Sequence, residues 1–270
     1  MNDDKFSFLE HISKQCAFQK SLTLNRPYDY KGVTFYPVGV EYIIEFYLCL
    51  EALTVKQERT KDKKLMKLPY LWFLAYAYEN WEQYQKPEYG LFIPLLYGLF
   101  ELVTRQNDVS IQVERDEKGN FKKCVLNLCG VELNYKDFNE IRQIIFAQAG
   151  IEHSDEFLNS DTERNIHEGR LYEQKKSGYV PPTLENLIDI LAMYLHKSTD
   201  ELTEKFTIRK FNNLIRYMSS FEEWKLLKGG EYSGMVTFKK PIPHWISGFA
   251  KQDIFADQNT DYKNSSLMKV

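Results

Sequence analysis

Residues 109–128, VSIQVERDEKGNFKKCVLNL, decide the class of the fold, because the apolar spacing changes here from the helical period that dominates the chain. Apolar and polar residues alternate in 109–115, and 121–128 continues this β-strand pattern. The intervening 116–120 ends in Gly-Asn, which favours a turn. A third short strand is predicted in VELNY, residues 131–135. We therefore expect a small antiparallel β-hairpin module.

On the N-terminal side of this module, apolar residues follow the 3.6-residue period of helices. The stretch GVEYIIEFYLCLEALTVKQE, residues 39–58, is apolar on more than one face, which predicts burial between other elements. Pro69 stands in the first turn of the next helix, where its missing N–H is tolerated. Pro94 is expected to end or kink the first turn of the third. Helices are predicted at 4–18, 39–58, 67–85 and 89–106, with extended chain and a turn at 21–38.

On the C-terminal side the pattern is helical again. Leucines recur at helical spacing in 179–197, behind a Pro-Pro pair. The glycine-rich stretch GGEYSG, residues 229–234, is interpreted as a flexible hinge, and 161–176 is predicted to be a polar helix. Helix starts are marked by Asp137 with Glu140, by Ser160 with Glu163, by Ser198 with Glu201, and by Thr207.

These patterns predict a mainly α protein, a helical bundle with a small antiparallel β-hairpin insert, α+β in class. Aromatic residues make up 15% of the chain, which predicts a core built from large rings. The expected parts are an aromatic-rich N-terminal helical part (1–108), the β-hairpin module (109–134), a C-terminal helical bundle (135–250) and a polar tail (251–270).

Composition argues against several classes of protein. The net charge of −3 lacks the basic excess of most nucleic-acid-binding proteins. No apolar run approaches the roughly 20 residues that cross a bilayer, and the polar, acidic start lacks the pattern of a secretory signal. We expect a protein of the cytoplasm that contacts no membrane. Its four cysteines are then expected to be free thiols.

Motifs for chemistry are missing from the sequence. Cys124 and Cys129 with His153 and His167 superficially resemble a zinc site, but an odd separation along one strand points the two cysteines to opposite faces. Phosphate-binding glycine motifs do not occur. Carboxylate pairs one helical turn apart, such as Glu41 with Glu45, are typical of solvated helix faces. We predict no catalytic residues, no metal ligands and no cofactor.

The nucleic-acid alternative rests on the helices predicted within 183–218. The last of them carries polar side chains in the manner of a recognition helix: Arg209, Lys210, Asn212, Asn213 and Arg216. A plain helical bundle explains the same pattern and is favoured, because the apolar residues between them need a core. The lysine-rich stretch 56–67 is interpreted as a solvated loop, with a phosphate-binding patch as the alternative.

Several segments taken together resemble a family of tailed-bacteriophage proteins described as tail assembly chaperones or baseplate-hub assembly proteins. The resemblance is carried, in order, by YKGVTFYPVGVEYIIEFYLCLEALTVKQ, KLMKLPYLWFLAYAYEN, KDFNEIRQIIFAQAGIE, TLENLIDILAMYLHKSTDELTEKFTIRKFNNLIRYM and YSGMVTFKKPIPHWISGF. It covers most of residues 30–250 and rests on pattern and order. It implies a non-enzymatic protein of the host cytoplasm or the virion that binds another tail or baseplate protein, with self-association as a further mode.

Within this family an assembly chaperone must cover an apolar surface of its partner. The candidate segment for this contact is SGMVTFKKPIPHW, residues 233–245. Its prolines stiffen the chain and lower the entropy lost on docking. Trp245 would be the anchor, because tryptophan is enriched among binding hot spots. The hypothesis is that this segment docks, either on the protein's own core or on a partner. The docking residues are Val236, Phe238, Ile242, His244 and Trp245.

Overall fold

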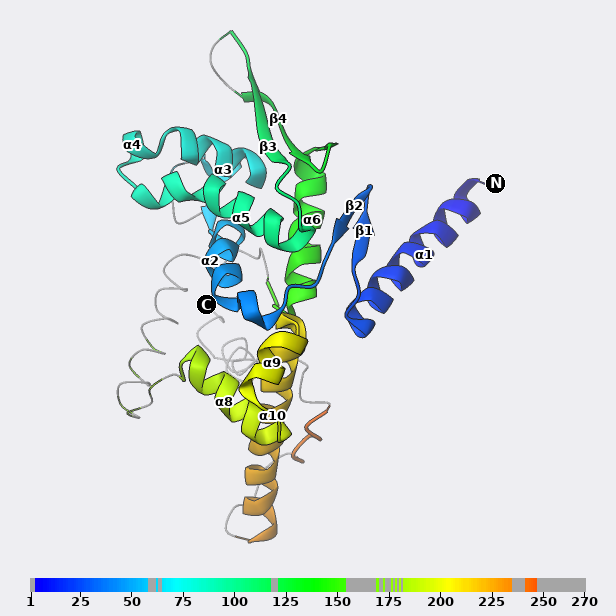
Figure 1. Cartoon of the computed structure of the whole chain (residues 1–270), viewed down its shortest axis with the longest axis vertical. Coiled ribbons are helices and arrows are strands. Elements are labelled where there is room, and N and C mark those ends of the chain that lie inside the picture. The colour runs from blue at the N-terminus through cyan, green and yellow to red at the C-terminus, as the bar shows by residue number, and fades with distance from the viewer. Residues whose placement is uncertain are drawn as a thin grey trace, which may run out of the picture. The chain divides into compact units, whose positions relative to one another are not determined.

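The computed structural model in Figure 1 describes residues 3–57, 62, 65–117, 121–153, 182–234 and 241–246, with isolated positions between 169 and 180, and gives side chains from residue 13 onward. The predicted class is confirmed: the protein is mainly α, with two small antiparallel sheets. The chain forms two compact units, residues 1–212 and 213–270. The division falls within the long helix α10 (Ile208–Tyr232).

The first unit contains the other described elements. Up to the hairpin module these are α1 (Asp3–Leu24), β1 (Tyr28–Tyr30), β2 (Val33–Phe35), η1 (Val40–Tyr42), α2 (Ile43–Thr54), η3 (Leu65–Lys67), α3 (Tyr70–Glu79), α4 (Trp81–Tyr84), η4 (Pro87–Leu91) and α5 (Phe92–Thr104). They continue with β3 (Val109–Arg115), β4 (Phe121–Leu128), β5 (Val131–Leu133), α6 (Tyr135–Ala149), α8 (Leu184–Leu195) and α9 (Thr199–Lys205).

Helices α2, α3, α5 and α6 pack together and form the core of the first unit (Figure 1). Aromatic rings fill it, as the composition predicts. The ring centre of Phe73 lies 5.8 Å from that of Tyr70 and 5.9 Å from that of Phe92. Phe138 lies 6.3 Å from Tyr70 and 6.4 Å from Phe100. Such ring pairs add about 0.5–1.5 kcal/mol each beyond the area they bury.

Strands β3 and β4 occupy the residues predicted for them. They pair antiparallel from Val109 opposite Leu128 to Arg115 opposite Phe121. The third strand, β5, pairs with β4 as expected, although it is only three residues long. The inner residues of β4 are buried and pack against α3 and α6. Residues on both faces of β4 are buried at Cys124, Val125 and Leu126, whereas burial in β3 alternates.

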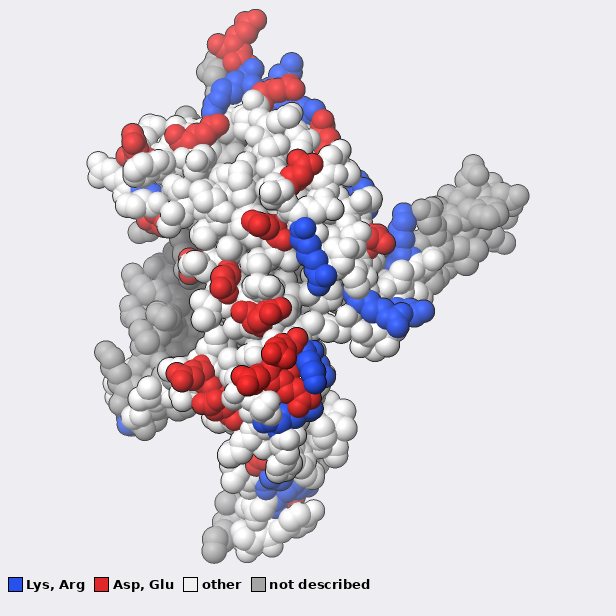
Figure 2. Space-filling view, viewed as in Figure 1, with Lys and Arg blue, Asp and Glu red and all other residues white. Residues whose placement is uncertain are grey.

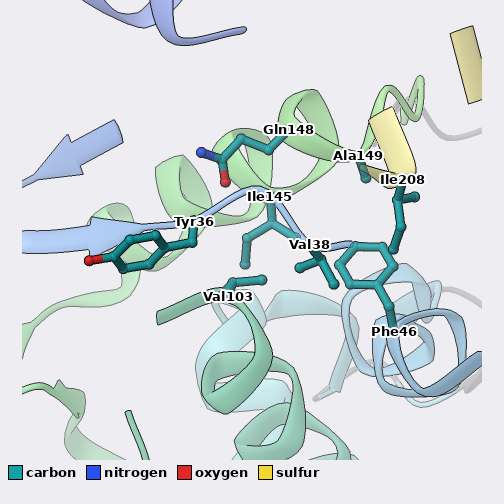
Figure 3. A pocket seen from close by; sticks show the side chains of 8 residues that line it. All are labelled: Tyr36, Val38, Phe46, Val103, Ile145, Gln148, Ala149 and Ile208. Atoms are coloured by element: carbon teal, nitrogen blue, oxygen red, sulfur yellow. The ribbon is translucent and has the colours of Figure 1, made fainter. Parts of the chain in front are cut away.

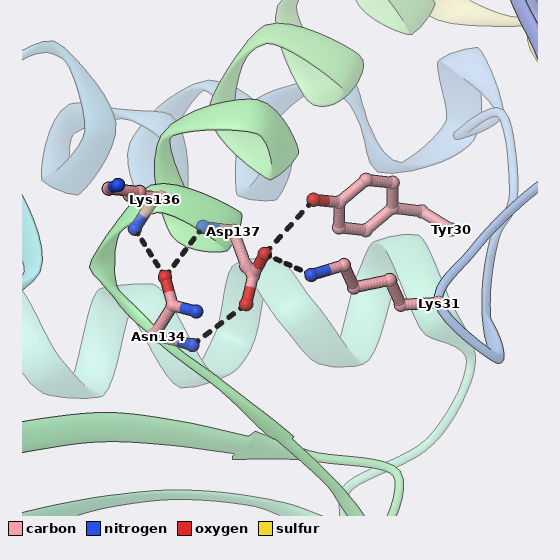
Figure 4. A network of polar contacts seen from close by, with 5 residues as sticks. All are labelled: Tyr30, Lys31, Asn134, Lys136 and Asp137. Carbon is pink, nitrogen blue, oxygen red and sulfur yellow. Dashed lines mark hydrogen bonds and ion pairs between the residues drawn. The ribbon is translucent and has the colours of Figure 1, made fainter. Parts of the chain in front are cut away.

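A second hairpin, β1–β2, is tied to the start of α6 by a polar network (Figure 4). The N-cap of α6 is Asn134, with Asp137 completing a capping box. The prediction that Asp137 itself caps this helix is wrong by three residues. The buried Asp137 carboxylate accepts hydrogen bonds from Lys31 Nζ at 2.6 Å, Tyr30 Oη at 3.2 Å and the Asn134 amide at 3.0 Å. Its position therefore joins the hairpin to the helix.

A short antiparallel bridge joins α9 and the start of α10 to the core. The Val40 amide donates to the Phe206 carbonyl, and the Ile208 amide donates to the Val38 carbonyl, each at 2.9 Å. The predicted caps at this junction are confirmed. Ser198 accepts from the Glu201 amide, and Thr207 accepts from the Lys210 amide.

Other predicted boundaries shift. The helix predicted to end at 85 breaks at Asn80 into α3 and α4. Pro94 lies in the first turn of α5, and the preceding turn is the 3-10 helix η4. The predicted hinge at 229–234 is wrong for its first four residues, because α10 continues through both glycines to Tyr232. The Ser160–Glu163 capping box, most of the predicted helix 161–176 and the tail 251–270 lie outside the described residues.

Candidate docking surfaces

In the second unit, part of the predicted docking segment packs on the end of α10. The ring centre of Trp245 lies 5.3 Å from that of Phe221, and that of His244 lies 5.4 Å from that of Trp224. A hollow of about 140 Å³ lies between segment and helix. Its lining includes Ile242 and Trp245 from the segment and Trp224 and Leu227 from α10. Val236 and Phe238 lie outside the described residues.

This arrangement places three of the five predicted docking residues, Ile242, His244 and Trp245, against their own helix. The Trp245 side chain is half-buried there, so its contact with Phe221 already uses part of the surface it would offer as an anchor. The segment still leaves Ile246 61% exposed. Docking of the segment on the protein itself is observed; docking of the same residues on a partner stays a prediction.

The polar residues proposed for a recognition helix make contacts within the protein. Arg209 donates to the carbonyl of Ala147. Asn212 donates to the carbonyl of Ala149 at 2.9 Å, so both residues bind the C-terminal end of α6. The Lys210 ammonium lies 3.8 Å from the Phe206 ring centre. On the later part of α10, Arg216 donates to Asn213 at 3.0 Å.

The charge near these helices is acidic. Residues 184–205, which span α8 and α9, hold five acidic side chains and two lysines. Figure 2 shows red side chains gathered over α8 and α9. Carboxylates repel a phosphate backbone, so this surface does not provide the basic footprint that nucleic-acid binding needs.

The two most exposed large apolar residues of the core helices, Ile44 and Leu48, lie on α2. Ile44 is 70% exposed, Leu48 55% and Tyr47 38%. Positions 44, 47 and 48 lie on one face of the helix, because residues three and four apart are neighbours. Three exposed glutamates, Glu41, Glu45 and Glu51, stand within three residues of this stripe along the chain. We call these six residues the α2 surface.

The rim of the α2 surface carries negative charge that no described cation neutralises. Among the residues with described side chains, Glu41, Glu45 and Glu51 make no ion pair. Glu41 and Glu45 stand in the first turns of η1 and α2, where carboxylates also favour the positive end of the helix dipole. In Figure 2, acidic side chains lie over α2 and the adjoining part of α5, with uncharged surface between them and a basic side chain beside them.

Beside the N-terminal end of the α2 surface lies an open hollow of about 670 Å³. Its walls come from the chain before α2, from α5 and from α9, and they include Glu41, Glu101 and Glu204. The two cations on its walls already have partners. The Arg105 guanidinium lies 4.4 Å from the Tyr36 ring centre, and Lys205 Nζ lies 3.7 Å from a Glu201 carboxylate oxygen. Three carboxylates and two cations therefore line the hollow, which gives it a small acidic excess.

Buried side chains of α3 and α6 hold the C-terminal end of α2. Arg142 of α6 donates to the Leu53 carbonyl at 2.9 Å. Tyr70 of α3 donates to the carbonyls of Ala52 at 3.0 Å and Val55 at 3.1 Å. These donors satisfy carbonyls that a helix end leaves without intrahelical partners, and the Arg142 cation complements the negative end of the dipole. The exposed face of α2 is therefore firmly oriented.

The inner side of α2 closes on a small gap in the core, shown in Figure 3. Phe46 of α2, Val38, Ile145 and Ile208 point into it, with Gln148 above. Its volume is about 10 Å³, no more than a single water molecule occupies. This gap is too small for a substrate or a cofactor.

The sequence misses the α2 surface. Apolar residues on more than one face predict burial of the helix between other elements, and that prediction is wrong for the face carrying Ile44 and Leu48. The signal that could have found it is the Glu41–Glu45 pair, which the sequence already assigns to a solvated face. Combining that pair with the apolar residues beside it would have predicted an exposed stripe with a charged rim.

The described part of the chain shows no candidate metal site and no activated cysteine at Cys124. No group of three or more histidine, cysteine, aspartate or glutamate side chains lies close enough there to hold a metal ion. Burial raises the pKa of the Cys124 thiol to about 12, with a smaller contribution from Glu79. That thiol is therefore a poor nucleophile. None of the described helices has the length and apolar character needed to cross a membrane.

Comparison of the chain with protein-family models, with curated proteins and with solved structures gives no match.

Proposed function

We propose that this protein is a non-enzymatic assembly factor for a bacteriophage tail or baseplate, and that it acts by binding another tail protein. The site of action would be the host cytoplasm, with retention in the virion as a further stage. The observation that carries the proposal is the α2 surface, where large apolar side chains stay exposed on a firmly held core helix. The family resemblance of the sequence supplies the biological setting.

Covering this stripe with a partner is energetically favourable. Full burial of an isoleucine or leucine side chain contributes about 1.5–3 kcal/mol. Ile44 and Leu48 keep 70% and 55% of their surface exposed, so covering both would contribute about 2–4 kcal/mol. Single exposed apolar residues are common on proteins. A group of three on one helix face with a charged rim has the composition of a binding site.

Nucleic-acid regulation by the helices within 183–218 is the second candidate, and the described contacts favour protein docking over it. Arg209 and Asn212 hold the end of α6, and the adjoining α8 and α9 carry an acidic excess. A gel shift at physiological salt separates the two functions. We expect no shift with duplex DNA or RNA; tight, salt-sensitive binding would favour the regulator.

Co-expression tests the proposed function directly. The chain is produced together with each tail and baseplate protein of the same phage, and complexes are isolated by gel filtration. We expect one of these proteins to co-elute at a fixed stoichiometry and to aggregate when produced alone. If the purified chain co-elutes with none of them, or if it turns over a small metabolite, the proposed function is wrong.

A further inference from the structure

We infer that the α2 surface receives an amphipathic helix of the partner protein whose apolar stripe is flanked by lysine or arginine residues. This inference rests on the proposed function and adds the chemistry of the partner to it. The structural observation is the combination of the apolar residues Ile44, Tyr47 and Leu48 with the carboxylates Glu41, Glu45 and Glu51 on one face.

The shape of the stripe fits a helix. Ile44, Tyr47 and Leu48 stand at the i, i+3 and i+4 positions, which form a narrow ridge along α2. Helices pack by placing the ridge of one into the groove of the other, and helical partners supply anchors at the same spacing. Tyr47 is held in place by a 3.0 Å hydrogen bond from its hydroxyl to Asn212, so the ridge is preformed.

The negative charge of the rim favours a partner helix with basic residues on both sides of its apolar stripe. Glu41, Glu45 and Glu51 make no ion pair within the side chains that the structure describes. The neighbouring cations Arg105 and Lys205 already contact Tyr36 and Glu201. A partner bearing lysine or arginine beside its apolar stripe gains attraction at every turn, whereas a partner with acidic flanks meets like charge.

The rigidity of α2 makes such docking favourable without rearrangement. Hydrogen bonds from Arg142 and Tyr70 hold its C-terminal end, and the bridge of Val40 with Phe206 holds the chain before it. A surface that is already ordered loses little conformational entropy when a partner binds. The unbound and bound positions of α2 are therefore expected to be the same.

The test uses the full chain and two labelled peptides of about 18 residues, about five helical turns each. Both carry leucines at i, i+3, i+4 and i+7 spacing. One has lysine flanks, and the other has glutamate at the same positions. Fluorescence anisotropy measures the Kd for each peptide at about 50 mM and about 500 mM salt, where screening lengths differ several-fold.

Three protein variants decide which residues bind. Ile44→Ser with Leu48→Ser removes the stripe, and Glu41→Gln, Glu45→Gln and Glu51→Gln together remove the rim charge. Ile190→Ser with Met193→Ser is the matched control, because these α8 residues are also exposed, by 39% and 72%. All the changes lie on the surface, and circular dichroism melting curves confirm that each variant folds like the wild type.

We expect the lysine peptide to bind the wild type. Its Kd should rise about tenfold in high salt, and about tenfold for the glutamine variant, because each ion pair with the rim contributes modestly. The serine pair on α2 should abolish binding, and the α8 pair should leave it unchanged. Equal binding of the glutamate peptide, or an α8 effect as large as the α2 effect, would overturn the inference. The inference would also be overturned if the wild type formed concentration-dependent dimers and the Ile44→Ser, Leu48→Ser variant did not, because a second copy of the chain would then occupy the α2 surface.

Co-expression with the tail proteins separates a failure here from a failure of the proposed function. If a tail protein is retained equally by the wild type and by both α2 variants, the docking site is elsewhere, so the inference fails while the function stands. If the wild type retains no tail protein, the function fails, and the two peptides still decide whether the α2 surface binds basic amphipathic helices.

Discussion

The guanidinium carbon of Arg142 lies 3.7 Å from the centre of the Tyr70 ring, with both side chains donating hydrogen bonds to the C-terminal carbonyls of α2. Arg142 is 3% exposed and Tyr70 7%, so the contact is inside the protein. Tyr70 and Arg142, which are 72 positions apart in the sequence, thus set the direction of α2, the helix that carries the α2 surface.

Replacing Arg142 with methionine is expected to lower the free energy of unfolding by about 3 kcal/mol. The change removes a buried cation–π contact and leaves the Leu53 carbonyl without its donor. Urea unfolding followed by circular dichroism measures the loss. Arg105→Met is the control, because its guanidinium also lies over an aromatic ring, that of Tyr36, but the side chain is exposed. Equal losses for the two variants would contradict a structural role for the buried contact.

Asp137 is expected to give the fold an acid-sensitive component of stability. Burial by itself raises the pKa of Asp137, but hydrogen bonds from Lys31 and the Asn134 amide outweigh it and hold the pKa below its usual value. A carboxyl with a lowered pKa in the folded state stabilises the protein above the pKa of the unfolded chain, about 3.9. That stabilisation is lost as the pH falls through the lower, folded-state pKa.

Asp137→Asn should therefore lower the free energy of unfolding by about 1–2 kcal/mol at neutral pH, and the difference from wild type should shrink below about pH 4. Urea unfolding across this range measures it. Glu201→Gln is the control. Its partner Lys197 lowers the pKa of Glu201, but solvent screens this surface pair, so little change is expected. A difference for Asp137→Asn that stays constant with pH would refute the charged role of Asp137.

Trp245→Ala is expected to loosen the docked segment from α10. The change removes the edge-to-face contact with Phe221, and such a contact contributes about 1 kcal/mol. Because His244 lies against Trp224, release of the segment should shift the indole N–H resonance of Trp224 in an NMR spectrum. Ile246→Ala is the control, since that side chain is largely exposed. An unchanged Trp224 resonance together with lost partner binding would assign Trp245 to a partner instead.

Cysteine labelling should follow burial. Cys16 is exposed and Cys124 is buried, with a pKa near 12. Because the thiolate is the reactive form, Cys16 is expected to react with a maleimide at least about tenfold faster than Cys124 near neutral pH. Mass spectrometry of peptides from the native and urea-unfolded protein measures both rates. Rapid native labelling of Cys124 would mean that β4 separates from α3 and α6.

Local sequence patterns predict the elements whose signals lie within a few residues of one another. The strand pattern and the turn residues between the strands place β3 and β4 at their observed bounds, because these signals lie within a few residues of one another. The caps at Ser198 and Thr207 are also correct, since a cap is a contact over three residues. The cap of α6 is misassigned to Asp137, because Asn134 three residues earlier offers an equally suitable side chain.

The sequence by itself determined the class of this protein, its β-hairpin module, its aromatic core and most helix positions, because hydrophobic period, turn residues and caps act over short distances. Only the tertiary structure decided which face of α2 is exposed, because that depends on where α5 and α6 pack and on the distant donors Arg142 and Tyr70. It also decided that α10 runs through Gly229 and Gly230, against their weak helix propensity, and that Trp245 lies against Phe221. Those outcomes depend on contacts between residues far apart in the chain, which no local pattern specifies.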